Sequence, residues 1–491
     1  MLNPNKDVLS LITENLEDDK ISLHSCLLVN RSWCEVAVPI LWKIPGRIIL
    51  SSKKAEDRLF NVIVLHLSKE SRVILKEQGV TFAETYQQPL FNYINFWRHL
   101  NLRLLEEMLS RNLGNSSSLT VSMIKLDLLS LFINKNTKFI SLYIPENSNW
   151  EINNISWAEQ YFSDLKNLCC DDIMNQNILK ELTTISESIK KLICDISKNS
   201  KNISGIVRLI EAQKNLNEIN IFCNDGEIVK IIEELLIKKA ITIQYLRLSW
   251  EPAAKFFSYF PNLKILEMDT PFFFWRPINY ANSNQEKSLP TLKILKGNLS
   301  SCMILIRLIK SANVHLTTIS IRYCSTFYGD NEVRELIQTI YQNCPNLRYI
   351  KVPFKRSNLI DFEKLLVNSK YLDGLVIDTV KLDINCRDLF KILLRSSSLN
   401  LFKIKFTFDR IKFKLLKSFL VNWKGRQPML LQINFVNFID TPQESNKKRL
   451  MSLIEEYKKK GIVKKFDLNQ HEIFEEFEWV HDESQLHYWT F

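Results

Sequence analysis

The sequence is poor in glycine, with 10 glycines among 491 residues, or about 2%, where ~7% is usual. Neither G-x-G-x-x-G nor G-x-x-x-x-G-K-[ST] occurs, so the glycine loops that hold dinucleotides and nucleoside triphosphates are missing. No uncharged apolar run reaches the ~18 residues of a membrane span, and the start MLNPNKDVLS does not resemble a signal peptide. We expect many similar short elements and no membrane partner.

Catalytic and metal-binding signatures are lacking as well. The 10 cysteines include no C-x-x-C pair and lie mostly in apolar runs, which indicates a reducing intracellular compartment, cytoplasmic or nuclear. Seven histidines are scattered, without H-E-x-x-H, and G-x-S-x-G is absent. We expect no catalytic residue, no metal and no cofactor, and therefore a protein that is not itself an enzyme.

Charge is unevenly distributed along the chain. The formal net charge is +11, but residues 466–491 hold seven acidic residues and no Lys or Arg, so residues 1–465 carry +18. Basic residues are densest at 403–426 and 447–465, where they alternate with apolar residues. This spacing is typical of the solvated face of a packed element, and it does not favour nucleic-acid binding.

Three short helices are predicted in residues 1–45. Apolar residues recur at helical spacing after Asn5, after Ser22 and again after Arg31, and Pro39 and Pro45 are expected to end the run. So short a unit cannot bury all its apolar side chains by itself. It needs a partner, or the rest of the chain, to cover it.

The same residues carry a motif. Val29-Asn30-Arg31-Ser32-Trp33, followed by Pro39-Ile40-Leu41-Trp42, resembles the F-box of fungal F-box families, the helical module that docks on the Skp-type adaptor of cullin-RING ubiquitin ligases. The resemblance implies that the adaptor contacts are Pro4, Val8, Leu9, Ile12, Leu23, Cys26, Leu27, Val29, Trp33 and Trp42. The alternative is that the three helices only cap the elements behind them.

A six-residue pattern of three apolar positions recurs downstream. It begins at Phe139, Leu165, Ile189, Leu216, Ile243, Leu263, Leu292, Leu316, Leu347, Leu372, Leu399, Leu430 and Val463. The mean interval from 139 to 430 is about 26 residues, within the ~20 to 29 of leucine-rich repeats, which these units resemble. The predicted fold is an α/β solenoid, a leucine-rich-repeat horseshoe with parallel strands inside and helices outside.

Four regions follow from these patterns. They are the F-box at 1–45, a helical linker with degenerate first repeats at 46–136, the repeats at 137–470, and an acidic aromatic C-terminal cap or tail at 471–491. Within the linker, 62–75 and 89–109 are expected to be helical.

Strand alternation assigns the repeat residues to two faces. The fourth and sixth pattern positions should point into the core, and the positions between them onto the inner face of the sheet. That face should be lined by Glu218, Asn220, Phe222, Tyr245, Arg247, Glu267, Asp269, Thr318, Ser320, Arg322, Tyr349, Lys351, Val376, Asp378, Lys403, Lys405, Gln432 and Asn434. Twelve strands at ~4.8 Å make a surface roughly 50 Å long, which fits a protein target better than a small molecule.

The residues favoured for target binding are Tyr245, Arg247, Glu267, Asp269, Arg322, Tyr349, Lys351, Lys403 and Lys405. Phe273, Trp275 and Arg276, in an aromatic insertion at 271–277, join them, because aromatic and arginine side chains often dominate binding energy. The insertion could equally fill a gap under a long loop, and the C-terminal aromatic residues could equally cap the last repeat.

The sequence thus indicates the substrate-recognition subunit of an SCF-type ubiquitin ligase. In this hypothesis the F-box binds the adaptor, the repeats bind an unidentified protein target, and the chain contributes proximity. The alternatives are a leucine-rich-repeat scaffold outside ubiquitin transfer and, less favoured, a nucleic-acid binder.

Overall fold

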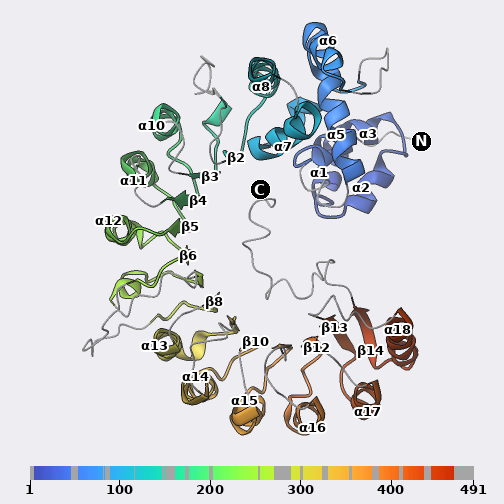
Figure 1. The fold of residues 1–491 in the computed structure, drawn as a ribbon, viewed down its shortest axis with the longest axis vertical. Helices are drawn as coiled ribbons and strands as arrows, with labels where there is room; N and C mark the ends of the chain where they lie inside the picture. Colours follow the sequence, from blue (N-terminus) through green and yellow to red (C-terminus); the bar gives the residue numbers. More distant parts are fainter. Residues whose placement is uncertain are drawn as a thin grey trace. The chain divides into compact units, whose positions relative to one another are not determined.

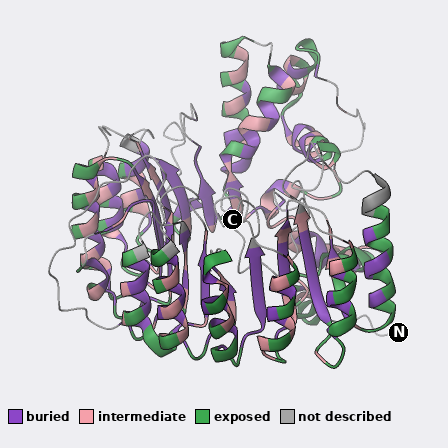
Figure 2. Ribbon diagram, turned by 60° about the horizontal axis from the view of Figure 1, so that its bottom comes forward, coloured by how far each residue is buried: buried purple, intermediate pink, exposed green. Residues whose placement is uncertain are grey.

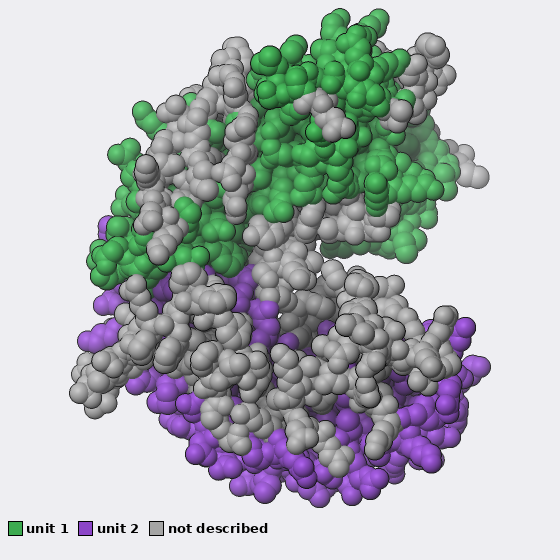
Figure 3. All heavy atoms as spheres, viewed as in Figure 1, with its two compact units in different colours: residues 1–235, 483–491 green, residues 236–482 purple. Residues whose placement is uncertain are grey.

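The structure is a computed structural model of the chain. It describes residues 5–45, 53–80, 82, 89–114, 117–145, 150, 161–171, 176–197, 203–252, 255–269, 289–298, 302–322, 330–352, 356–378, 386–408, 413–435 and 444–468. The chain divides into two compact units, residues 1–235 with 483–491, and residues 236–482 (Figure 3).

The first unit begins with three helices, α1 (Lys6–Glu14), α2 (Lys20–Cys26) and α3 (Arg31–Leu41). Asn5 and Asn30 cap α1 and α3, each accepting a hydrogen bond from a backbone N–H of the first turn. We call residues 5–45 the N-terminal module. Its core contains the buried residues Leu23, Cys26, Ala37 and Leu41.

Two details of these helices differ from the sequence prediction. α2 begins at Lys20, because the Asp19 carboxylate accepts hydrogen bonds from the backbone N–H and hydroxyl of Ser22 and so provides an N-cap upstream of it. Pro39 lies inside α3 and does not end it. The Trp42 N–H still reaches the Val38 carbonyl at 3.0 Å, which keeps the last turn closed around the proline.

The linker region contains more and shorter elements than predicted. It contains α5 (Lys53–His66), α6 (Lys69–Glu77), the 3-10 turn η1 (Tyr93–Phe96), α7 (Leu102–Leu113) and α8 (Ser118–Phe132). The expected helix at 62–75 is broken, because Ser68 caps the start of α6. The expected helix at 89–109 is present only from Leu102 onward, as the start of α7, because residues 99–101 form the strand β1 (His99–Asn101).

Strands and helices then alternate through the first unit. The strands are β1, β2 (Ser141–Tyr143), β3 (Asn167–Asp171), β4 (Lys191–Ile196) and β5 (Glu218–Cys223), and neighbours along the chain pair in parallel. The helices between them are α10 (Gln176–Ile185) and α11 (Ile203–Ala212), while α12 (Gly226–Lys239) begins in this unit and ends in the second.

The second unit continues the same order. Its strands are β6 (Tyr245–Leu248), β7 (Ile265–Asp269), β8 (Ile294–Asn298), β9 (Thr318–Ile321), β10 (Tyr349–Lys351), β11 (Gly374–Asp378), β12 (Lys403–Phe408), β13 (Met429–Phe435) and β14 (Val463–Asp467). Each strand pairs in parallel with the next.

The connections of the second unit run along one side of its sheet (Figure 1). They contain η3 (Phe256–Tyr259), α13 (Cys302–Ala312), η5 (Asn313–His315), α14 (Asp330–Asn343), η6 (Arg356–Asn358), α15 (Leu359–Asn368), α16 (Cys386–Ser396), α17 (Phe413–Asn422) and α18 (Glu444–Lys459). The helices bury their sheet-facing sides and expose their outer sides (Figure 2).

This architecture is a leucine-rich-repeat-like solenoid, a parallel sheet alternating with helices, as the sequence predicted. Fourteen strands lie in chain order in the described part of the chain. Strand β1 adds one repeat that the sequence pattern did not predict. In the register of the sheet Leu100 pairs with Leu142, so the buried Trp97 takes the first apolar position of that repeat.

Two of the predicted repeat starts are wrong. The structure aligns Leu375 of β11 with Ile404 of β12 and Leu431 of β13, so the twelfth repeat starts at Leu401 instead of Leu399, and the next starts two residues before Leu430. Leu399 is 67% exposed, whereas Leu401 is fully buried. Both shifts are by two residues, and therefore the assignment of side chains to the two faces is unchanged.

Polar side chains make turns that glycine makes in other repeats. In the Pro-Asn-Leu turns before β7 and β10, Asn262 donates to the Ile241 carbonyl at 2.8 Å and Asn346 to the Val314 carbonyl at 2.9 Å. Thr291 donates to the Pro261 and Leu263 carbonyls in the equivalent place. Each bond joins one turn to the preceding repeat, which explains how the chain dispenses with turn glycines.

Candidate functional site

The N-terminal module exposes an unusual number of apolar side chains. Among its described residues, six large apolar side chains are exposed: Val8, Leu11, Ile12, Ile21, Leu28 and Val29. Ile21 and Leu28 reach 83% and 88% exposure. Val8, Leu11 and Ile12 are three and four residues apart, and so share one face of α1. Clustered exposed apolar side chains are typical of an interaction surface.

The predicted adaptor contacts fall into three groups in this module. Val8, Ile12 and Val29 are exposed; Leu27, Trp33 and Trp42 are half-buried; and Leu9, Leu23 and Cys26 are buried. Pro4 lies outside the described residues. The buried three form the interior that holds the exposed side chains in place, and Trp42 packs on Tyr93 with 4.5 Å between ring centroids.

Sequence reasoning missed Leu11, Ile21 and Leu28 as members of this surface. Their exposure follows from how α1 to α3 pack. In the sequence, Leu11 fits the helical spacing of apolar residues as well as its neighbours do. Only the packing of the helices shows which side of α1 is exposed to solvent.

In the second unit, the strand register gathers four of the predicted target-binding residues into one charge network. Arg247 of β6 donates to Asp269 at 2.7 Å, and Arg322 donates to the other oxygen of Asp269 at 3.1 Å. Glu267 lies between Arg247, at 3.8 Å, and Lys296, at 3.2 Å. We call Arg247, Glu267, Asp269, Lys296 and Arg322 the paired network.

Arg247 and Glu267 of the paired network are buried, whereas Asp269 and Arg322 are partly exposed. Arg247 is only 1% exposed. Burial works against its charge, but the carboxylates of Glu267 and Asp269 outweigh this effect and raise the pKa of Arg247. Lys296 was not among the predicted lining residues. The cations and carboxylates of this network pair with one another and so hold one fixed conformation. Such a network does not favour binding of a strongly charged ligand.

Further along the same sheet, beyond the paired network, the inner face carries lysines on β10 and β12. Lys351 of β10 and Lys405 of β12 lie in one row across the strands, with Val376 of β11 between them. Lys403 lies two residues before Lys405, with its ammonium 5.4 Å from the ring centre of Tyr349. We call Lys351, Lys403 and Lys405 the lysine strip.

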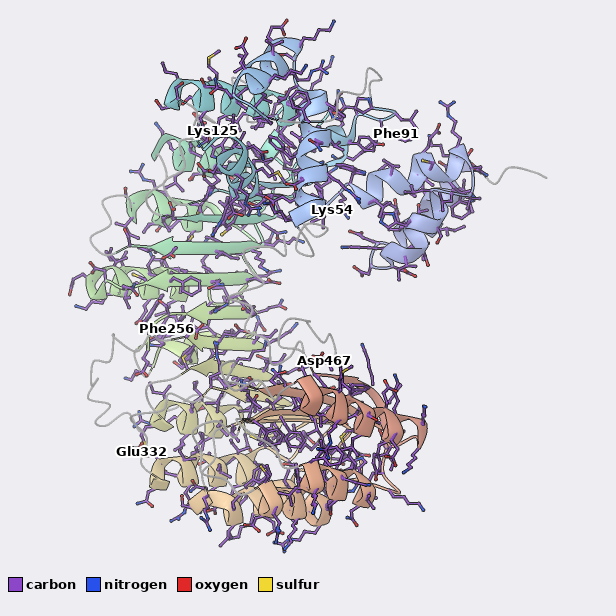
Figure 4. The ribbon with its side chains drawn as sticks, turned by 45° about the vertical axis from the view of Figure 1, so that its right-hand side comes forward. Lys54, Phe91, Lys125, Phe256, Glu332 and Asp467 are labelled. Atoms are coloured by element: carbon purple, nitrogen blue, oxygen red, sulfur yellow. The ribbon has the colours of Figure 1, made fainter. Side chains whose placement is uncertain are left out.

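Lys405 is the most buried of the three. It is 9% exposed, and it makes no ion pair with any side chain that the structure describes. Burial, together with repulsion from Lys351, lowers the pKa of Lys405 to about 8, although Asp467 acts in the opposite direction. Asp467, labelled in Figure 4, accepts a hydrogen bond from Gln432 at 2.9 Å.

The remaining predicted lining residues occupy the expected strand positions, but several are not open to solvent. Tyr245, Asn220, Thr318, Ser320, Val376 and Gln432 are buried. Glu218, Phe222, Tyr349 and Asn434 are half-buried. The six buried side chains do not present an open surface. The side chain of Asp378, and all of Phe273, Trp275 and Arg276, lie outside the described residues.

The sheet of the first unit has a different character. Tyr143, Cys169 and Ile193, in register on neighbouring strands, form a buried apolar cluster. Asn220 continues this row, and neither polar atom of its buried side chain has a hydrogen-bond partner among the described residues. This row of the first unit therefore carries no charged side chain.

Reactive groups are few in the described part of the chain. No group of three or more His, Cys, Asp or Glu side chains there is arranged to hold a metal ion. Eight cysteines of the described residues are free thiols, and burial raises the pKa of Cys344 to about 12. None of the described helices is long and apolar enough to cross a membrane.

Comparisons with known proteins give one structural similarity. No protein-family model matches the chain, and no curated protein matches its sequence. Among solved structures, the chain is similar to the leucine-rich-repeat-containing protein LegL7 from Legionella pneumophila. The identity is 14%, the TM-score is 0.36, and the match covers 67% of this chain and 98% of LegL7. The strand and helix repeat itself defines the fold of the chain.

Proposed function

We propose that this chain is the substrate-recognition subunit of an SCF-type ubiquitin ligase. The N-terminal module binds a Skp-type adaptor, and through it a cullin-RING ligase, while the sheet of the repeats binds a protein target. The chain then acts by proximity and needs no nucleophile, metal or general base.

One observation carries the proposal. Val8, Ile12 and Val29, which the F-box resemblance assigns to the adaptor, are exposed apolar side chains on the module. The three helices keep them exposed because Leu9, Leu23 and Ala37 fill the interior instead. Solvent-exposed Val and Ile at these positions add nothing to the packing of the module, so a partner that buries them explains their presence.

The test is retention of a Skp-type adaptor by the full chain. We expect the intact chain to co-purify with the adaptor, and the double variant Val8→Asp/Ile12→Asp to bind it at least about tenfold more weakly, because two apolar contacts become charged. A matched control is Ile241→Asp/Ile360→Asp, two well-exposed residues of the second unit. The control should bind like the intact chain.

Two outcomes decide against the proposal. If the intact chain does not retain the adaptor, the F-box assignment fails. If the chain fails to retain the adaptor but still captures a protein target, the alternative gains support, namely a leucine-rich-repeat interaction scaffold outside ubiquitin transfer. Far-UV circular dichroism of each variant shows that lost binding is not lost folding.

A further inference from the structure

We propose that the outer face of α15 is a docking surface for a protein partner, and that the docking segment of the partner is an amphipathic helix with acidic side chains. The surface lies within the second unit and shares no residue with the N-terminal module, so it is independent of adaptor binding. Six exposed residues of α15 and of two adjacent turns form this surface, and we call them the α15 face: Ile360, Lys364, Val367, Lys370, Tyr371 and Leu399.

The apolar part of the α15 face begins on the helix itself. Ile360 and Val367 are 71% and 58% exposed, and residues seven positions apart lie on the same side of a helix. Lys364 lies between them on that side. The opposite side of α15 packs into the core through side chains such as Phe362 and Leu366, which are buried. Ile360 and Val367 therefore contribute little to the core of their own repeat.

Two turns extend this apolar surface. Tyr371 and Leu399, in the turns before β11 and β12, are 57% and 67% exposed. Ser398 donates to the Lys370 carbonyl at 2.8 Å, and Asn400 donates to the same oxygen at 3.3 Å. Leu399 lies between these two donors in the chain, so its turn lies beside the turn of Tyr371. Clustered exposed apolar side chains of this kind are typical of an interaction surface.

The helices on either side of α15 have polar outer sides. α14 and α16 pack against α15 (Figure 1), and neither exposes a large apolar side chain among its described residues. The exposed side chains are Asn331, Glu332, Glu335 and Gln342 on α14, and Arg387, Lys391 and Arg395 on α16. The repeat therefore does not require Ile and Val at the outer positions of α15, where β-branched residues also lower the helix propensity.

The charge of the α15 face is positive. The two carboxylates of α15 are held by the neighbouring helices, since Asp361 accepts a hydrogen bond from α14 and Glu363 accepts one from α16. Lys364 and Lys370 are exposed, and neither forms an ion pair with a residue that the structure describes. A second copy of the chain would bring the same lysines together and be repelled. A partner with Asp or Glu around an apolar stripe complements both the lysines and the apolar side chains.

The shape of the α15 face suits a helix. The distance from Ile360 to Val367 along the helix axis is about 10 Å, at ~1.5 Å per residue. Exposed side chains on one helix form ridges that pack into the grooves of another, and an amphipathic helix is a common occupant of such a surface. We therefore expect a partner helix of about three turns, with apolar residues every three or four positions and acidic residues beside them.

The test measures binding of a labelled synthetic peptide to the full chain by fluorescence anisotropy. The peptide has about 15 residues, with leucine every three or four positions and glutamate beside each leucine. We expect Ile360→Asp/Val367→Asp to weaken its binding at least about tenfold. A second peptide with lysine in place of each glutamate should bind the intact chain at least about threefold more weakly. The variant Lys364→Glu/Lys370→Glu should reverse that preference, a gain of binding that misfolding cannot produce.

A control variant and a vesicle measurement complete the experiment. Val314→Asp/Val421→Asp changes two other exposed apolar residues of the second unit, and it should bind the glutamate peptide like the intact chain. Equal binding of this peptide by the intact chain and by Ile360→Asp/Val367→Asp, or no binding by either, would overturn the inference. Binding of the intact chain to vesicles of phosphatidylcholine and phosphatidylserine, if lost in Ile360→Asp/Val367→Asp, would assign the surface to a membrane and overturn it as well. Failure to retain a Skp-type adaptor, with peptide binding as expected, would count only against the proposed function.

Discussion

At the scale of single residues, a glycine and a leucine show why a sequence pattern can mislead. Gly297 occupies an apolar position of its repeat, so the pattern treats it as a defect. In the sheet it pairs with Met268, and an added Cβ would lie 2.2 Å from the Met268 carbonyl oxygen. The glycine is therefore required by a close approach of two strands. Leu399 is the opposite case, since it fits the pattern but is exposed.

Gly297→Ala should destabilise the protein clearly. The methyl group would overlap a backbone atom that cannot move without disturbing β7, and overpacking of this kind costs ~1–3 kcal/mol. The measurement is the urea midpoint of the full chain. Gly425→Ala is the control, because Gly425 has a φ of +86° with no atom within 4 Å of the added Cβ, so only backbone strain of ~1 kcal/mol applies there. A midpoint for Gly297→Ala at or above that of Gly425→Ala contradicts the close approach.

At the scale of elements, neighbouring repeats are joined by polar contacts as well as by their cores. Besides the asparagine turns, Arg395 of α16 binds Glu363 of α15 through two nitrogens, at 2.6 and 2.5 Å, and Ser396 donates to the same carboxylate. These hydrogen bonds, first from Arg395 and then from Ser396, lower the pKa of Glu363. The contact links two helices that are separate in the sequence.

Glu363→Gln should weaken the protein in a pH-dependent way. The folded pKa lies below the unfolded value, so the unfolded state binds the proton first as pH falls. The contribution of the ion pair is full above about pH 4.5 and disappears as pH drops through the folded pKa. Because the pair is largely exposed, we expect a cost of only ~0.5 kcal/mol at pH 7.

Urea unfolding of the intact chain and of Glu363→Gln at pH 7, and at successively lower pH, measures this effect. The two stability curves should converge toward acid. Glu332→Gln, an exposed site on α14, serves as the control for loss of one charge. A difference between the curves that does not depend on pH would show that the charge of Glu363 is not responsible.

At the scale of the whole molecule, the positive charge is distributed and partly paired. Arg348 pairs with Asp373, Arg103 with Glu107 and Lys125 with Glu106, all within 3 Å. In the second unit the paired network neutralises most of its own charge. A net charge of +11 therefore does not create the basic stripe that binding to a polyanion requires.

The full chain should not bind nucleic acid specifically. We expect no retention of a fluorescent DNA duplex or RNA at physiological salt, measured by anisotropy. If weak binding occurs, it should change little between ~50 and ~200 mM salt, whereas a protein with many phosphate contacts loses ~10³-fold or more in affinity. A steep salt dependence would support the nucleic-acid alternative and would count against a purely protein-binding sheet.

The sequence by itself determined the repeat, the parallel strands, the three N-terminal helices and the face on which each strand residue lies. These features are local, because side chains alternate every two residues in a strand and recur every 3.6 in a helix. An error of two residues, as at Leu399, does not alter the face. For the same reason Asn5 correctly marked the start of α1, and α3 begins at Arg31, one residue before the predicted start.

Only the tertiary structure decided which of these residues are buried and paired. Asp269 binds both Arg247 and Arg322 because the register of the sheet brings together residues that are 22 and 53 positions apart, and no local pattern contains that register. The same holds for Lys405, which is buried without a described ion-pair partner, and for Leu11 and Ile21, which remain exposed. Burial depends on every neighbour of a side chain, and most neighbours are distant in the sequence.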